Sequence, residues 1–218
     1  MKRLLLTAFN LIICYLTYSQ NFISEIKSFE KQDSLSMPNS GQILLAGSST
    51  FRLWLNYKED LRDFPVINRG FGGSQMSDLN FYFDRIITTY NPKIILVYEG
   101  DNDLSAGESP ISVLEDFKIF AEKVKNQLPN TIVGYCSIRP SLARLNMCDK
   151  QMQANGMIKK YCKKLKGFYY IDIQKKFYLK NGDVMPDIFV SDKLHMNKKG
   201  YDIWTKATQK FLKKRFKS

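Results

Sequence analysis

Apolar residues along this chain gather in short, continuous runs that alternate with longer stretches of helical periodicity. Such runs are typical of strands buried on both faces of a sheet, and the periodic stretches are typical of the helices that cover it. The predicted strands are residues 42–47, 65–68, 93–98, 131–137 and 168–173. The predicted helices are residues 22–32, 51–61, 75–90, 109–128, 146–165 and 198–216, with a polar connector at 33–41. The alternation predicts an α/β fold whose parallel sheet is covered by helices on both faces.

Small and polar residues follow the first three predicted strands. Gly47-Ser48-Ser49 ends the first, residues 70–74 follow the second, and residues 100–103 follow the third. Ligands of parallel α/β sheets bind beyond the carboxyl ends of the strands. The chemistry of the chain is therefore expected at this edge of the sheet.

Each of these turns has a chemical and a structural interpretation. Ser49 would be exposed at the sheet edge, with its backbone N–H at the start of a helix, or it would only cap that helix. The glycines at 70, 72 and 73 allow the backbone to approach a ligand, but Gln75 breaks the dinucleotide-binding fingerprint, which leaves a plain tight turn as the alternative. Asn102 offers a neutral donor suited to an oxyanion, or it forms a turn or helix cap.

His195 is the only histidine of the chain, and it stands three residues after Asp192. Acid–base chemistry through an imidazole near neutral pH would have to use this residue, because no other side chain has an unperturbed pKa in that range. Taken alone, a single histidine is more often structural, so the surrounding motifs decide its interpretation.

Together these segments resemble the SGNH hydrolase family, also called GDSL-type esterases and lipases, over roughly residues 42–216. The matching blocks, in family order, are Gly47-Ser48-Ser49-Thr50, Gly72-Gly73-Ser74, Gly100-Asp101-Asn102-Asp103 and Asp192-Lys193-Leu194-His195. The stretch from Gly47 through Trp54 is similar to a bacterial branch related to platelet-activating-factor acetylhydrolase. The family usually has aspartate where this chain has Ser48, which puts the local turn geometry in doubt more than the activity. The resemblance implies a three-layer α/β/α sandwich with a mostly parallel, five-stranded sheet of flavodoxin-like topology.

The resemblance also implies a mechanism of acyl transfer through a serine. Ser49 would attack an ester carbonyl, His195 would take and return its proton, and Asp192 would orient the imidazole. The N–H groups of Ser49 and Gly73 and the side chain of Asn102 would hold the oxyanion. Family members use no metal or other cofactor, and a chain with one histidine and no Cys-x-x-Cys pair offers no persuasive zinc set.

The motifs leave the substrate open. A lysophospholipid-like or other acyl ester and an O-acetylated carbohydrate both suit the predicted chemistry, so a carbohydrate O-deacetylase is an alternative within the same fold. A non-catalytic binding module that uses a basic surface is the alternative outside enzymes. Oligomeric state has no signature in the sequence.

Length and the first residues suggest the domain organisation. At 218 residues the chain fits one domain with a sizeable core. Residues 1–19 have the charged start and apolar stretch of a secretory signal peptide, which predicts cleavage near Ser19 and an exported protein. Residues 20–41 are then a helical lead-in and connector, and residues 42–218 form the hydrolase domain.

Charge and cysteine content restrict the partners. The formal charge of +12 becomes +10 once Lys2 and Arg3 are removed, and the lysines are spread along the chain rather than collected in one site. We expect a solvated basic surface with weak attraction to anionic membranes or polymers and no specific nucleic-acid binding. We also expect no disulfide framework, since Cys148 and Cys162 on one helix would stand about 21 Å apart and Cys136 lies in an apolar run.

Overall fold

The computed structural model describes residues 22–216, and the predicted signal segment lies outside them. The chain divides into two compact units, Met1–Met37 and Pro38–Ser218. Within the first unit, helix α2 covers Ile23–Leu35, so it continues three residues into the predicted polar connector. Of the helices formed by residues 22–216, none has the length and apolar character needed to cross a bilayer.

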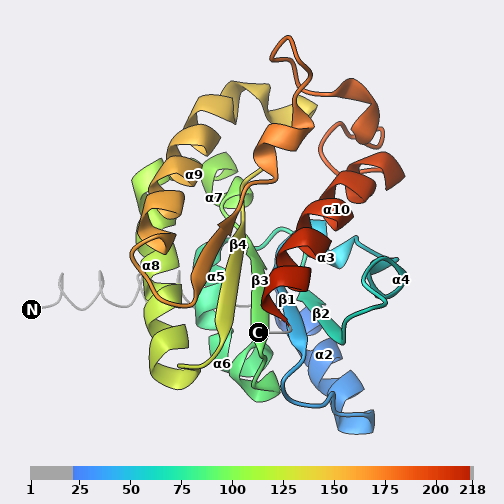
Figure 1. The fold of residues 1–218 in the computed structure, drawn as a ribbon, viewed down its shortest axis with the longest axis vertical. Coiled ribbons are helices and arrows are strands. Elements are labelled where there is room, and N and C mark those ends of the chain that lie inside the picture. The colour runs from blue at the N-terminus through green and yellow to red at the C-terminus, as the bar shows by residue number, and fades with distance from the viewer. Residues whose placement is uncertain (1–21, 217–218) are drawn as a thin grey trace, which may run out of the picture. The chain divides into compact units, whose positions relative to one another are not determined.

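The second unit is built on a five-stranded sheet in which all neighbouring strands are parallel, in the order β2-β1-β3-β4-β5. The strands are β1 Ile43–Gly47, β2 Val66–Gly70, β3 Ile94–Tyr98, β4 Ile132–Cys136 and β5 Phe168–Ile171. The helices are α3 Ser49–Arg52, α4 Tyr57–Asp60, α5 Met76–Phe81, α6 Phe83–Ile86, α7 Asp101–Ser105, α8 Pro110–Gln127, α9 Cys148–Cys162 and α10 Lys198–Arg215. Short 3₁₀ turns are η1 Thr88–Tyr90, η2 Leu142–Met147, η3 Gln174–Phe177 and η4 Pro186–Ile188. Helices α5, α8 and α9 lie on one face and α10 on the other, which confirms the predicted α/β/α sandwich (Figure 1).

The strands are where the apolar runs predict them because every residue of β1 and β3 is buried. Their register pairs Gly47 with both Gly70 and Tyr98, so β1, β2 and β3 end level with one another. The turns that follow these strands are thereby brought to one edge of the sheet.

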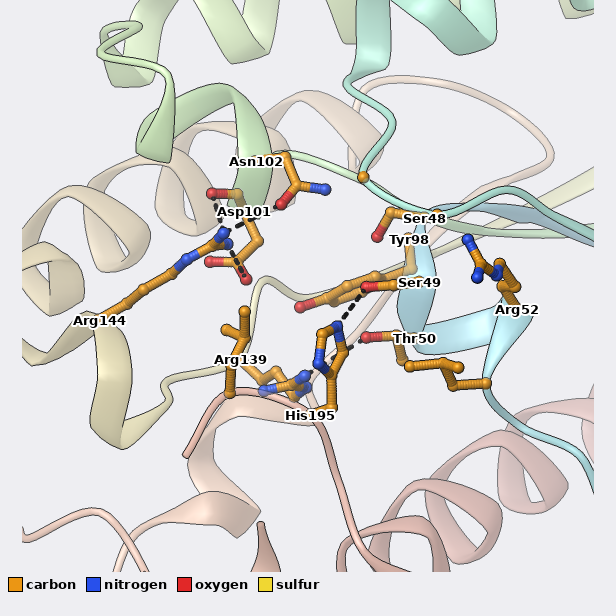
Figure 2. Close-up of a pocket in the computed structure, with 14 residues that line it drawn as sticks. Ser48, Ser49, Thr50, Arg52, Tyr98, Asp101, Asn102, Arg139, Arg144 and His195 are labelled. Carbon is orange, nitrogen blue, oxygen red and sulfur yellow. Dashed lines mark hydrogen bonds and ion pairs between the residues drawn. The ribbon is translucent and has the colours of Figure 1, made fainter. Parts of the chain in front are cut away.

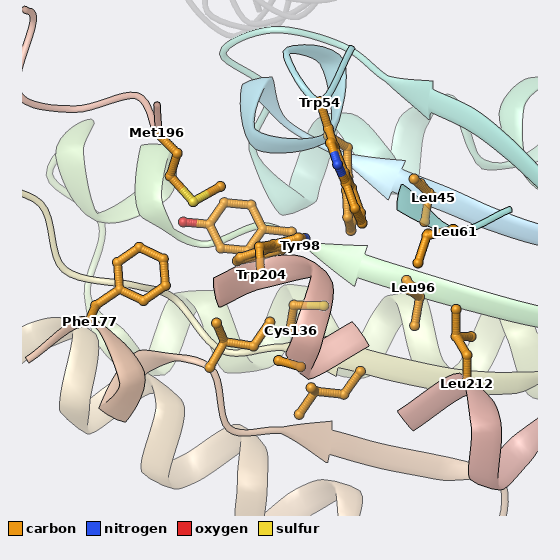
Figure 3. Close-up of a cluster of buried hydrophobic side chains, with 14 of the residues drawn as sticks. Leu45, Trp54, Leu61, Leu96, Tyr98, Cys136, Phe177, Met196, Trp204 and Leu212 are labelled. Carbon is orange, nitrogen blue, oxygen red and sulfur yellow. The ribbon is translucent and has the colours of Figure 1, made fainter. Parts of the chain in front are cut away.

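Aromatic and aliphatic side chains together fill the core between the sheet and α10 (Figure 3). The ring of Trp204 meets Tyr98 edge to face at 5.1 Å and Phe51 at 5.9 Å between ring centres. Phe51 belongs to the turn that follows β1, and Tyr98 is the last residue of β3. Helix α10 therefore packs against the edge of the sheet at which the turns meet.

Two predicted helices are wrong in their continuity. Residues 51–61 form α3 and α4 with a turn between them, because the ring of Trp54 turns inward and its Nε1 donates a hydrogen bond to the Asp60 carboxylate. Residues 75–90 form α5, α6 and η1, which end at Asn91 with a left-handed φ of 40°. Apolar periodicity does not distinguish one helix from successive helical turns that bury the same face.

Other helix boundaries moved for local reasons. The predicted helix at 109–128 is confirmed as α8, with the Ser109 hydroxyl accepting the N–H of Ser112 at 3.1 Å. The predicted helix at 146–165 begins as the 3₁₀ turn η2 and becomes α-helical at Cys148. Helix α9 carries both Cys148 and Cys162, and these two thiols and that of Cys136 are free.

Candidate active site

Ser49 is the first residue of α3, directly after the glycine that ends β1. Gly47 has a φ of 141°, and a side chain there would overlap the carbonyl oxygen of Tyr98. The N–H of Ser48 donates to that same carbonyl at 3.1 Å, and the N–H of Phe71 donates to the Gly47 carbonyl at 2.8 Å. The neighbouring strands therefore fix the turn, and Ser48 takes part through its backbone, independently of its side chain.

Asp192 and His195 lie in a tight turn just before α10. One carboxylate oxygen of Asp192 accepts the backbone N–H of Leu194 at 2.8 Å and that of His195 at 2.9 Å. The other lies 2.6 Å from His195 Nδ1. Burial alone would raise the pKa of Asp192, but the hydrogen bonds from the His195 side chain and the two backbone N–H groups lower it to about 2. Asp192 is therefore a carboxylate throughout the neutral range.

The histidine also reaches the serine. His195 Nε2 lies 3.0 Å from Ser49 Oγ, although the two residues are 146 positions apart in the chain (Figure 2). Because the Asp192 carboxylate accepts a hydrogen bond from Nδ1–H, it favours the tautomer in which Nε2 is the acceptor for the serine hydroxyl. The structure thus brings Ser49, His195 and Asp192 into one chain of hydrogen bonds.

Asn102 lies on α7 with its amide held at both ends. Its Nδ2 donates to the carbonyl of Ser74 at 2.9 Å, and its Oδ1 accepts from Arg144 Nη2 at 3.1 Å. Arg144 also forms an ion pair of 2.6 Å with Asp101. These contacts set the orientation of the amide, whose Nδ2 carries a second hydrogen beside the one donated to Ser74.

Gly73 lies in the turn after β2, with a φ of 85° and open space where a side chain would begin. Its neighbour Gly72 is different, since a side chain there would overlap the guanidinium of Arg52. Gly73 has a left-handed backbone that favours glycine, whereas a side chain at Gly72 would require the flexible side chain of Arg52 to move.

A pocket of about 330 Å³ joins these groups (Figure 2). Ser49, Gly73, Asn102 and His195 line it, whereas Asp192 lies behind the histidine. Its other lining residues are Ser48, Thr50, Arg52, Leu53, Gly72, Tyr98, Asp101, Arg139, Arg144 and Leu194. The four residues that the sequence predicts to face a substrate therefore line one cavity.

The arginines of this pocket were not among the residues predicted from the sequence. Arg139 follows the fourth strand, so the strand-end rule that indicated the first three turns would have reached it. Arg144 lies in η2 with the non-helical angles φ −129° and ψ 34°, and no periodic pattern indicates such a position.

Two buried acids, Glu99 and Asp103, form hydrogen bonds with the turns next to the pocket. Burial, together with the charge of nearby Asp103, raises the pKa of Glu99 well above its usual range. Ser74 Oγ lies 2.6 Å from Glu99 Oε1 and 3.0 Å from the carbonyl of Phe71, yet a hydroxyl has one proton. A protonated Glu99 donating to Ser74, which then donates to Phe71, satisfies both contacts and ties β3 to the glycine turn.

Asp103 completes this support. Burial raises the pKa of Asp103 to about 7, although the N–H groups of Met76 and Gly100 donate to its two oxygens at 2.9 Å each. Among residues 22–216, the carboxylates of Asp103, Glu108 and Asp116 are the acidic group close enough to share a metal ion, within 4.8 Å. They are not among the residues that line the pocket.

Comparison with known proteins identifies the family. The sequence profile of the GDSL-like lipase/acylhydrolase family matches residues 40–203. The fold and this match define an acylhydrolase built on a parallel α/β/α sandwich, and the chain belongs to the GDSL-like lipase/acylhydrolase family. A search of curated protein sequences finds no match.

Solved structures share the fold at low sequence identity. A Streptococcus pneumoniae protein provisionally assigned as a platelet activating factor is 18% identical with a TM-score of 0.78, covering 94% of this chain and 98% of its own. A GDSL-like lipase of Bacteroides thetaiotaomicron is 16% identical with a TM-score of 0.72, covering 87% and 97%. A family 3 carbohydrate esterase of Clostridium thermocellum is 14% identical with a TM-score of 0.64, covering 82% and 98%. At such identities these likenesses establish the fold.

Proposed function

We propose that this protein is a serine esterase that hydrolyses carboxylic esters with short acyl groups through Ser49. The observation that carries the proposal is the unbroken series of hydrogen bonds from Ser49 Oγ through the His195 ring to Asp192, at 3.0 and 2.6 Å. Membership of an acylhydrolase family supports the same chemistry.

Acylation begins when Ser49 Oγ attacks the ester carbonyl and passes its proton to His195 Nε2. The resulting oxyanion accepts from the N–H groups of Ser49 and Gly73 and from the free Nδ2 hydrogen of Asn102. Asp192, whose pKa is lowered to about 2, stabilises the positive imidazolium throughout this step.

The tetrahedral intermediate then breaks its bond to the alcohol, which leaves with the proton of His195 Nε2. Water attacks the acyl group on Ser49 and gives its proton to the same nitrogen. The second tetrahedral intermediate collapses as His195 Nε2 returns the proton to Ser49 Oγ and the carboxylic acid leaves, so no group beyond the chain and water is needed to balance the reaction.

The size of the pocket supports short acyl groups. Its volume of about 330 Å³ must accommodate both sides of the ester. This lies at the lower end of the roughly 300–1,000 Å³ found for ligand sites. We expect turnover to be greatest for acetyl esters and to fall toward octanoyl esters.

Fluorophosphonate labelling tests the nucleophile. The reagent should modify the peptide that contains Ser49, and mass spectrometry should find the label on Ser49 itself. Ser49→Ala should abolish both labelling and hydrolysis of p-nitrophenyl acetate, whereas the matched variant Ser48→Ala should still be labelled. No labelling, together with no turnover above Ser49→Ala from acetyl to octanoyl esters, would overturn the proposal. Salt-sensitive binding to an anionic polymer that survives Ser49→Ala would then support a binding module instead.

A carbohydrate O-deacetylase is the second candidate, favoured by the small pocket and by the carbohydrate esterase among the structures that share this fold. Acetate release from an acetylated polysaccharide would support it. Fatty-acid release from a lysophospholipid would support a lipase-like role.

A further inference from the structure

Arg139 is a charged side chain in the wall of the pocket, and it has almost no exposure to solvent. It follows β4 and is 2% exposed, yet it lines the same pocket as Ser49 and His195. Figure 2 shows its guanidinium extending toward Thr50, on the side of the site where His195 lies. A guanidinium remains positively charged in proteins, so this charge is permanent.

The protein supplies little to balance that charge. Arg139 Nη1 donates to the carbonyl of Pro140 at 3.4 Å and Nη2 to Thr50 Oγ1 at 3.5 Å, both long for hydrogen bonds. Its Nε is buried and has no partner. The rings of Phe177 and Phe189 face the guanidinium at 5.9 Å each. Over residues 22–216, no carboxylate lies within ion-pair distance of this side chain.

Arg144, in the same pocket, shows the contrast. Its side chain is also largely buried, at 16% exposed, but its guanidinium is paired with Asp101 at 2.6 Å. Buried charges are ordinarily paired in this way, because desolvation otherwise makes burial unfavourable. A buried, unpaired guanidinium in the wall of a ligand pocket therefore points to a negative partner that arrives with the ligand.

We propose that Arg139 binds an anionic oxygen group of the substrate, and that the preferred ester carries a carboxylate or phosphate close to the scissile bond. This inference rests on the proposed function and adds a substrate class to it. The guanidinium can donate two parallel hydrogen bonds to either anion, and water is excluded around it. Arg139 is thus a specificity residue that contacts the substrate away from the reacting carbonyl.

Matched esters test the preference. The neutral reference is methyl 4-acetoxybenzoate, and the anionic esters are 4-acetoxybenzoate and 4-acetoxyphenyl phosphate, which separate a carboxylate from a phosphate. The 4-nitrophenyl monoester of glutarate and its methyl ester place the charge on the acyl side instead. Hydrogen bonds to charged groups imply a kcat/KM at least about tenfold higher for the preferred anionic ester.

Arg139→Gln should reduce that ratio to about one, and Arg139→Lys should retain part of it. The matched control is Arg62→Gln, which removes the same charge from an exposed site paired with Glu59. Arg62→Gln should keep the wild-type ratio. A ratio that is the same in wild type and Arg139→Gln, for both carboxylate and phosphate and for either side of the ester, would overturn the proposal.

Binding without turnover separates this proposal from the esterase mechanism. Benzoate and inorganic phosphate are titrated into Ser49→Ala by calorimetry at constant ionic strength, with benzamide as the neutral comparison. We expect one of the two anions to bind, and binding to be lost in Ser49→Ala/Arg139→Gln. Arg139-dependent binding in a protein without esterase activity would support the anion site and contradict the proposed function alone.

If Arg139→Gln does not fold, the wild-type protein still decides the question. Benzoate or phosphate should slow fluorophosphonate labelling of Ser49, whereas benzamide at equal concentration should not. Equal labelling rates with all three compounds would overturn the proposal.

Discussion

Asp192 is held by hydrogen bonds from its own turn, and it in turn orients the ring of His195. Two backbone N–H groups of its own turn hold one oxygen, which leaves the other fixed at 2.6 Å from the imidazole. The imidazole is consequently oriented by a local turn of four residues, and only Ser49 has to be brought in by the fold. This arrangement makes the aspartate's role testable separately from folding.

Asp192→Asn should reduce kcat for p-nitrophenyl acetate by about 10⁴. An amide no longer favours the proton on Nδ1 and does not stabilise the imidazolium. The loss should appear in kcat with little change in the thermal midpoint of unfolding. Unchanged activity in this variant would show that Asp192 only stabilises the turn.

Asn102→Ala should reduce kcat by about 10²–10³, the effect of removing one oxyanion donor. The matched control, Asn181→Ala, removes an amide from an exposed loop and should leave kcat unchanged. A loss smaller than threefold in Asn102→Ala would exclude the side chain from the oxyanion site.

Ser49, Gly73, Asn102 and His195 line one pocket, and sequence motifs could indicate them because each follows a strand or lies in a short local turn. Arg144 shows why the rest of the site was not predicted. Its contribution depends on its contacts with Asp101 and Asn102, some 42 residues earlier in the chain, and on non-helical backbone angles. No local pattern encodes a contact of that kind.

At the scale of elements, strands were more predictable than helices. A strand buried on both faces requires an unbroken apolar run, so the five runs gave the five strands. Helix α7 was not predicted because its five residues, Asp101–Ser105, are short and polar and lack a periodic apolar face. The turn at Trp54 was missed because the direction of one indole ring interrupts the helix there.

The close contact between Gly47 at the end of β1 and Tyr98 at the end of β3 gives a prediction at this scale. Gly47→Ala should lower the free energy of unfolding by at least about 3 kcal/mol, since the new side chain meets the Tyr98 carbonyl at a φ of 141°. The control is Gly156→Ala on α9, where a side chain would meet nothing within 4 Å, and it should stabilise the protein by up to about 1 kcal/mol. Urea unfolding measures both. Equal effects would show that the strand ends are less tightly fixed than described.

For the whole molecule, the buried acids make stability depend on pH. In the folded chain the pKa values of Glu99 and Asp103 are raised, that of Asp103 to about 7. At a pH between the ordinary pKa and the raised pKa of each group, the folded chain therefore holds a proton that the unfolded chain has lost. Their stabilisation is complete at low pH and is lost as pH rises, by about 1.4 kcal/mol per pH unit for each proton. The lowered pKa of Asp192 adds pH dependence only between its ordinary value and about 2, where its contribution to stability is lost as pH falls, and above that range the contribution is constant.

The free energy of unfolding from urea titrations should therefore fall between pH 5 and pH 8. Glu99→Gln removes one of the two groups and keeps a donor for Ser74, so its fall should be shallower. Identical pH slopes for the two proteins would show that Glu99 is ionised in the folded state.

The distance in sequence between Ser49 and His195 also orders events during synthesis. In the proposed mechanism the nucleophile is translated early, with the sheet, but its base and that base's carboxylate stand immediately before α10. A nascent chain that ends before residue 192 contains the residues of all five strands and of the glycine turns, but it lacks the proposed base. General-base catalysis in the proposed mechanism therefore depends on residues that are translated after the whole sheet.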